Sequence, residues 1–137
     1  MDKKKNGFTL VEVLAVIGIL AILATLFIPN SIKLLKNNNL KIYKIKESQL
    51  VSAAKDFVYD EKFIAPTIEN PSYITITQLA EGSYLSKILD TTSGVECDAF
   101  VKVTLVGEND YEFYPCIICE EYTTNNDFCT SDMYNSL

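Results

Sequence analysis

A long apolar segment dominates the first part of the chain. From Phe8 to Ile28 there are 21 residues, of which only Glu12 is ionisable. Because a helix rises about 1.5 Å per residue, a run of roughly 20 apolar residues is long enough to cross the hydrocarbon core of a bilayer. The pattern predicts a transmembrane helix over residues 8–29 that contacts the membrane through residues 8–28.

Helical periodicity continues beyond this run. Apolar residues recur at i, i+3 and i+4 spacing, which indicates one buried helix face. These positions are Leu50, Ala53, Ala54, Phe57 and Val58. We expect an amphipathic second half of the same helix within residues 30–62, ending near Glu61, with this face packed against a head formed by residues 63–137.

Two features interrupt the helical pattern. Pro29 removes one backbone hydrogen bond, so it predicts a kink rather than an end of a long helix. The run Asn37 to Asn39 predicts a local loosening or bend, since asparagine side chains compete for backbone hydrogen bonds.

A loop and a short helix are expected next. Pro66 and Pro71 place a loop between Ile64 and Tyr73. The stretch from Ile74 to Gly82 has a short-helix signature. Thr75 and Gln78 have capping-box spacing, and Gly82 stands where a left-handed C-terminal residue is expected.

The pattern changes to period two from Ala99 onward, which predicts a β-hairpin with its turn at residues 107–110. Facing the apolar positions across the hairpin pairs Leu105 with Tyr111, Val103 with Phe113 and Ala99 with Ile117. The same register sets Cys97 opposite Cys119, and Pro115 within the second strand indicates an edge strand or a bulge. Tyr111, Tyr114 and Tyr122 are expected either to cover a small core or to form surface contacts.

The four cysteines all lie within the last 41 residues. An even number confined to an exported domain favours two disulfides. Cys97 with Cys119 follows from the register, and Cys116 with Cys129 follows by elimination. Zinc is the alternative, but only Cys116 and Cys119 form a short pair, and the chain has no histidine. The elements together predict an α+β fold.

Charge is distributed unevenly along the chain. The net charge is −6, yet residues 31–60 carry six lysines against three acidic residues, whereas residues 61–137 carry three lysines against thirteen acidic residues. An acidic head argues against direct nucleic-acid binding. Without histidine the commonest general base is missing, so we expect no catalytic residue, no metal and no cofactor.

The leader before the apolar run is basic. Lys3, Lys4 and Lys5 predict a cytoplasmic N-terminus by the positive-inside rule, with the chain after Pro29 outside. Glu12 is costly in a membrane segment unless it is paired. It either sits at headgroup depth or, if the chain is cut after Gly7, pairs with the new amine of Phe8.

The residues from Lys3 to Asn30, with Gly7, Phe8 and Glu12 followed by the apolar run and Pro29, resemble the N-terminus of a type IV prepilin or pseudopilin. The resemblance implies a leader of residues 1–7, cleavage by prepilin peptidase after Gly7 and N-methylation of Phe8. It also implies a role for Glu12 in processing and subunit docking, and a pilin-like fold. A secretory signal peptide is the alternative, but no small-x-small cleavage site follows the apolar run.

A second, shorter resemblance lies in the segment from Ile74 to Leu85, which is similar to one common in pilin-like proteins of Gram-positive bacteria. It favours a source among these bacteria.

The resemblance implies a structural subunit of a type IV pilus or related filament. Its expected partners are further copies of itself, prepilin peptidase, a membrane assembly platform and other pilin-like subunits. The expected location is a single-pass membrane precursor that becomes a cell-surface filament. A minor pilin or pseudopilin for DNA uptake or secretion, an adhesion subunit and a plain membrane anchor are the alternatives, and an enzyme is the least favoured class.

Overall fold

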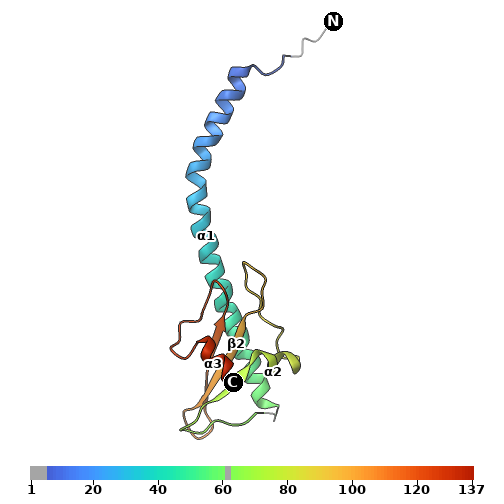
Figure 1. Cartoon of the computed structure of the whole chain (residues 1–137), viewed down its shortest axis with the longest axis vertical. Helices are drawn as coiled ribbons and strands as arrows, with labels where there is room; N and C mark the ends of the chain where they lie inside the picture. Colours follow the sequence, from blue (N-terminus) through green and yellow to red (C-terminus); the bar gives the residue numbers. More distant parts are fainter. Residues whose placement is uncertain (1–5, 61–62) are drawn as a thin grey trace. The chain divides into compact units, whose positions relative to one another are not determined.

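The computed structural model describes residues 6–60 and 63–137, without the side chains of residues 27–34. The chain divides into two compact units, Met1–Leu40 and Lys41–Leu137. Figure 1 shows the elements in chain order. They are α1 (Leu10–Tyr59), β1 (Ser72–Thr75), α2 (Ile76–Glu81), β2 (Asp98–Leu105), β3 (Tyr111–Ile118) and α3 (Ser131–Asn135).

Helix α1 confirms the predicted long helix. It begins two residues later than expected because Thr9 caps it, and Glu61, the expected end, lies outside the described residues. The helix is continuous through Asn37–Asn39, so the loosening predicted there is wrong. The side chain of Pro29 is among those not described, and the kink at this residue stays a prediction.

The second unit contains a three-stranded antiparallel sheet of order β1-β2-β3. The register between β2 and β3 is the predicted one, with Leu105 opposite Tyr111 and Ala99 opposite Ile117. Pro115 lies in β3, which is an edge strand as predicted. The α+β class is therefore confirmed, with a helix packed against a small antiparallel sheet as in pilins.

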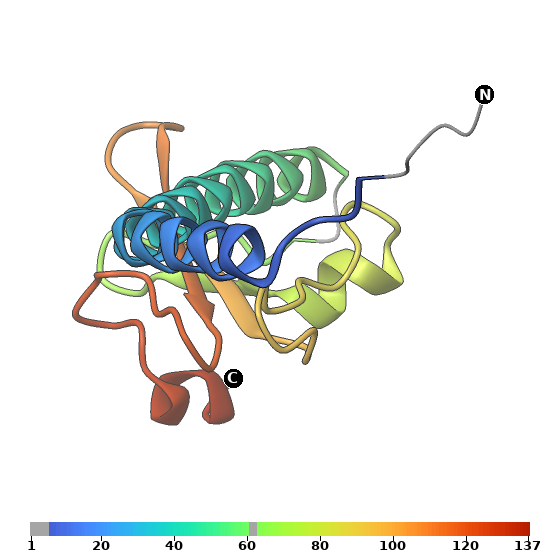
Figure 2. The same ribbon diagram turned by 90° about the horizontal axis from the view of Figure 1, so that it is seen from above.

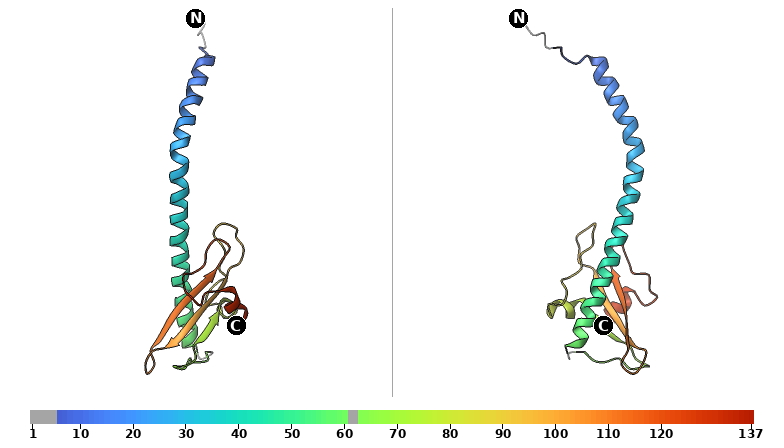
Figure 3. Two further views of the ribbon diagram at one scale, coloured as in Figure 1. Left: turned by 60° about the vertical axis from the view of Figure 1, so that its left-hand side comes forward. Right: turned by 180° about the vertical axis from the view of Figure 1, so that it is seen from behind.

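One face of the sheet packs against α1. Leu50 and Ala54 on the helix are fully buried against Val101 and Val103 on β2, and the periodic helix positions predicted from the sequence form this face. Burying such side chains contributes about 1.5–3 kcal/mol each for the larger ones. In Figure 3 this part of α1 runs along the strands.

The other face of the sheet has a second, smaller core. Phe100 is fully buried there with Cys116 and Cys129, and its ring lies 6.0 Å from that of Phe128 and 6.4 Å from that of Tyr134. Figure 2 shows α1 and α3 on opposite sides of the sheet. This second core and α3 were not predicted from the sequence.

Strand β1 corrects the expectation for residues 64–82. Residues Ser72 to Thr75 pair with β2, where a loop and the start of a helix were predicted. Ile74 is paired with Val101 and almost fully buried, so its place in the core determines the extended conformation. The predicted capping box is confirmed, since Thr75 and Gln78 cap α2 reciprocally.

The end of α2 also differs from the prediction. Gly82 has φ −79°, and the left-handed residue is Ser83 with φ 61°. The amide of Tyr84 donates to the Leu79 carbonyl and that of Ser83 to the Ala80 carbonyl, which is the hydrogen-bond pattern of a Schellman motif. A glycine is needed at 82 for space, because a Cβ there would lie 2.5 Å from the Tyr84 ring.

We therefore expect Gly82→Ala to destabilise the protein by about 1–3 kcal/mol, the usual cost of overpacking. The Tyr84 ring cannot move freely because its hydroxyl donates to Asp60. Urea unfolding of the full chain in detergent measures the change. Gly107→Ala is the matched control, since the nearest atom to its Cβ lies at 3.7 Å. Equal stability of the two variants would contradict this packing argument.

Candidate functional site

The N-terminal segment begins with exposed, non-helical residues. A methyl group added at Gly7 would meet no atom within 4 Å, and Phe8 is 88% exposed. The backbone amide of Thr9 donates to Glu12 Oε2 at 3.1 Å, and the amide of Glu12 donates to Thr9 Oγ1 at 3.3 Å. This reciprocal pair is a capping box at the start of α1.

The capping box gives Glu12 a partner that was not predicted from the sequence. Thr9 and Glu12 have the same capping-box spacing as Thr75 and Gln78, so this hydrogen-bonded pair could have been predicted from the sequence. A carboxylate in the first turn also lies at the positive end of the helix dipole. Glu12 is thus bound to the backbone of its own chain before any cleavage after Gly7.

The first part of α1 is apolar on every side. All side chains from Leu10 to Leu26 are exposed, and the large aliphatic ones among them are 44% to 77% exposed. Only Glu12, Gly18 and Thr25 interrupt the aliphatic residues in this stretch. A patch of this extent marks a surface that binds protein or membrane.

Within the part of the chain that the structure describes, no helix meets the length and hydropathy required of a membrane span.

Both predicted disulfides are present in the head. Cys97 is bonded to Cys119 with Cα atoms 4.7 Å apart, and Cys116 to Cys129 with Cα atoms 5.3 Å apart. The first joins the start of β2 to the end of β3, as the register required. The second fixes the C-terminal segment to the outer face of the sheet.

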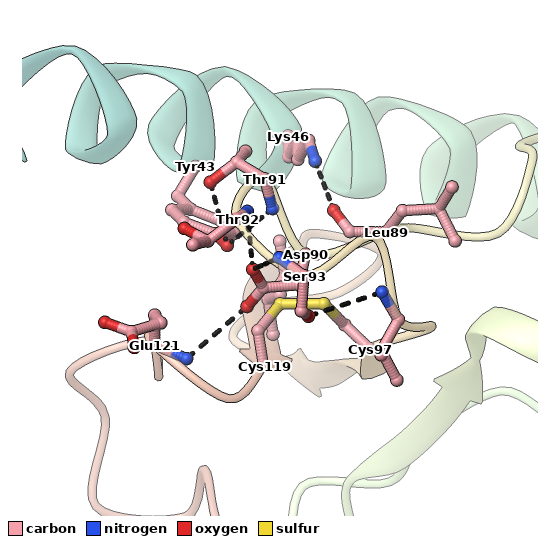
Figure 4. Close-up of a disulfide and its surroundings, with 12 residues drawn as sticks. Tyr43, Lys46, Leu89, Asp90, Thr91, Thr92, Ser93, Cys97, Cys119 and Glu121 are labelled. Atoms are coloured by element: carbon pink, nitrogen blue, oxygen red, sulfur yellow. Dashed lines mark hydrogen bonds between the residues drawn. A yellow bond between two sulfur atoms is a disulfide. The ribbon is translucent and has the colours of Figure 1, made fainter. Parts of the chain in front are cut away.

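A buried carboxylate adjoins the first disulfide. Asp90 is 3% exposed, and it accepts hydrogen bonds from the amides of Thr92 at 2.7 Å, Ser93 at 3.1 Å and Glu121 at 3.4 Å. Figure 4 shows this carboxylate beside the sulfur atoms. Hydrogen bonds from these amides, with that of Thr92 the strongest cause, lower the pKa of the Asp90 carboxyl group. This residue was not predicted as a site, although an Asp followed by Thr, Ser and Gly is a recognisable turn signature.

Asp90 also bears on metal binding. One of its oxygens and the sulfurs of Cys97 and Cys119 lie within 4.8 Å of one another, which is the spacing of metal ligands. The two sulfurs are bonded to each other, so they are not available as thiolate ligands in this state. The arrangement supports a structural turn rather than a metal centre.

A second network ties α1 to the segment after β3. The rings of Tyr43 and Tyr122 stack with centroids 4.2 Å apart. Glu47 accepts hydrogen bonds from Tyr122 Oη at 2.6 Å and Thr124 Oγ1 at 2.7 Å. Burial and the bond to Glu47 raise the pKa of Tyr122 to about 12. Tyr122 therefore covers the core, as predicted, while Tyr114 is exposed.

The comparison with protein families agrees with the N-terminal geometry. Residues 2–28 match the family model described as the prokaryotic N-terminal methylation motif. The chain therefore carries a prokaryotic N-terminal methylation motif. No curated protein and no solved structure matches the chain significantly.

The match includes Gly7, Phe8 and Glu12 and ends before the head. It supports a pilin-like protein. A source among Gram-positive bacteria stays a prediction. The head carries the two disulfides and the Asp90 turn, and these features lie outside the matched residues.

The lowered pKa of Asp90 predicts acid sensitivity. A carboxyl group whose pKa is lower in the folded state stabilises the fold above its unfolded pKa of about 3.9, and this contribution is lost as the pH falls through the folded value. We expect Asp90→Asn to melt at a lower temperature than wild type at pH 7, with the difference shrinking below about pH 4. Melting temperatures of the full chain between pH 2 and 8 test this.

The control for the acid titration is Asp127→Asn, which changes an exposed carboxylate of the same head. It should melt like wild type across the range. A difference between Asp90→Asn and wild type that is constant with pH would show that the charge of Asp90 has no part in stabilising the turn.

Proposed function

We propose that this protein is a structural subunit of a type IV pilus or a closely related filament. The observation that carries the proposal is the methylation motif at residues 2–28 joined to an apolar, exposed helix surface from Leu10 to Leu26. Prepilin peptidase removes residues 1–7 by cutting after Gly7, and the new N-terminal Phe8 is methylated. Residues 8–29 then anchor the subunit in the membrane until it joins the filament.

The location follows from charge and cysteine chemistry. Lys3, Lys4 and Lys5 keep the leader in the cytoplasm. The disulfide-bonded head, residues 63–137, lies outside the cell, where disulfides persist. The amphipathic segment within residues 30–62 connects the two and contributes one face to the core of the head.

Assembly exchanges lipid for protein around the apolar helix. The helix moves from the membrane into a bundle of copies of itself, so its apolar surface stays buried throughout. A carboxylate in such a bundle is heavily penalised unless it is paired, and the amine of Phe8 created by cleavage supplies the opposite charge. A new subunit therefore joins the filament only at an axial position where its Glu12 forms this ion pair.

Protein recovered from sheared cell surfaces tests the proposal directly. N-terminal sequencing and intact mass should show a chain that starts at N-methylated Phe8 and contains two disulfides. Gly7→Val should block cleavage without disturbing the fold, since the position faces open space. A wild-type chain that still starts at Met1, or is cut beyond Pro29, would refute pilin processing. The number of copies relative to other pilin-like proteins separates a major subunit from a minor pilin.

Two substitutions separate the charge of Glu12 from its capping role. Glu12→Gln keeps a capping-box residue at this position but removes the charge, whereas Glu12→Ala removes both. If the ion pair directs assembly, both variants are still cleaved after Gly7, but the filament yield of each falls by about tenfold or more. Electron microscopy and immunoblots of sheared fractions measure this yield. Wild-type yield from Glu12→Gln would assign Glu12 to helix capping alone.

A further inference from the structure

Charged side chains of opposite sign lie at opposite ends of the second unit, Lys41–Leu137, which is called the head from here on. Lys41 and Lys44 are exposed on the first turns of α1 within the second unit. Glu108 and Asp110 are exposed in the loop between β2 and β3. This loop lies at the far end, because Asp110 lines one cavity together with Tyr59, the last residue of α1.

The two ends are separated by a distance that the helix sets. From the level of Lys41 and Lys44 to the level of Tyr59, α1 rises about 25 Å at 1.5 Å per residue. Charges this far apart in water and salt are screened from each other, since the Debye length is about 8 Å at physiological ionic strength. The two groups therefore cannot neutralise each other within one molecule.

Within the described residues, none of these four side chains takes part in an ion pair. Among the residues that the structure describes, the ion pair is Lys87 with Glu96, at 2.8 Å. Lys46, the next lysine along α1, donates to the carbonyl of Leu89 at 2.6 Å. Lys41, Lys44, Glu108 and Asp110 are thus available to a second molecule.

The geometry of a second copy follows from chain connectivity. Lys41 follows residue 40 directly, so the basic end of each head is the end joined to the N-terminal segment, and copies assembled through that segment point the same way. Parallel copies placed side by side without an axial shift set lysines against lysines. A shift along the helix axis brings the acidic loop of one copy to the basic turns of the next.

We propose that the loop carrying Glu108 and Asp110 of one subunit docks against Lys41 and Lys44 of the following subunit, forming a head-to-tail interface along the filament. The inference rests on the proposed function, since it requires parallel copies. Such a heterologous contact does not close on itself, and it generates an open helical assembly. Exposed ion pairs are individually weak, so repetition along the filament makes the interface effective, and the charges mainly determine register.

Charge reversal with rescue tests the interface. Lys41→Glu with Lys44→Glu, and separately Glu108→Lys with Asp110→Lys, should each lower the yield of sheared filaments by about tenfold, because each pair of changes sets like charges together. Combining all four changes should restore most of the yield, since the ion pairs are re-formed with opposite polarity. Wild-type filaments should also become easier to shear into short pieces as salt is raised.

A matched control separates position from net charge. Glu120→Lys with Asp127→Lys makes the same change in charge at exposed sites outside the acidic loop, and it should leave the yield unchanged. Mass spectrometry of each variant checks that both disulfides form. Loss of filaments in this control, or no recovery in the fourfold variant, would overturn the interface, as would normal yield from either reversed pair.

Two outcomes distinguish failure of this interface from failure of the proposed function. If wild-type cells methylate Phe8 and make filaments, and the charge-reversed variants do the same, only the head-to-tail contact is refuted. Wild-type cells that neither process the chain nor make filaments refute the filament subunit itself, and with it this interface.

Discussion

The register between β2 and β3 is the constraint on which the head depends. With Val103 opposite Phe113 and Ala99 opposite Ile117, one set of alternating side chains meets α1, and Phe100 and Cys116 face the other way. A slip by one residue would exchange the two faces and separate Cys97 from Cys119. The sheet thus supports two cores only because its pairing is correct.

Covalent bonds and polar networks reinforce the two small cores of the head. About 100 residues bury a limited apolar area, and a disulfide typically contributes about 2–4 kcal/mol by restricting the unfolded chain. Cys97–Cys119 closes the sheet at the end where Asp90 and Glu47 also bind segments distant in sequence. Cys116–Cys129 holds the C-terminal segment over Phe100.

The N-terminal part of α1 differs from the head because its apolar side chains are not buried. Its apolar side chains are exposed from Leu10 to Leu26, so its stability depends on surroundings other than the chain itself. A membrane and a bundle of identical helices would both supply such surroundings, in line with the proposed filament assembly. In the proposed head-to-tail contact, the lysines at one end of the head and the carboxylates at the other determine the register between subunits. The uniform apolar surface of the helix does not specify a register.

The features that could be predicted from the sequence are local or periodic. Residues three and four apart gave the helix face around Leu50 and Ala54, residues two apart gave the hairpin register, and that register brought Cys97 to Cys119. The motif around Gly7 and Glu12 is a contiguous run, so it could be read without a fold. The capping box of Thr9 and Glu12 is equally local, because its two residues stand three positions apart.

Features that rest on contacts between residues distant in sequence could not be predicted in this way. Strand β1 has four residues, too few to show a period, and it is extended because Ile74 pairs with Val101. The buried Asp90 accepts a hydrogen bond from the amide of Glu121, which is 31 residues away. Ser83 rather than Gly82 is left-handed, and the Tyr84 ring leaves no room for a Cβ at position 82. No local pattern encodes these choices, since each depends on a neighbour that the folded chain supplies.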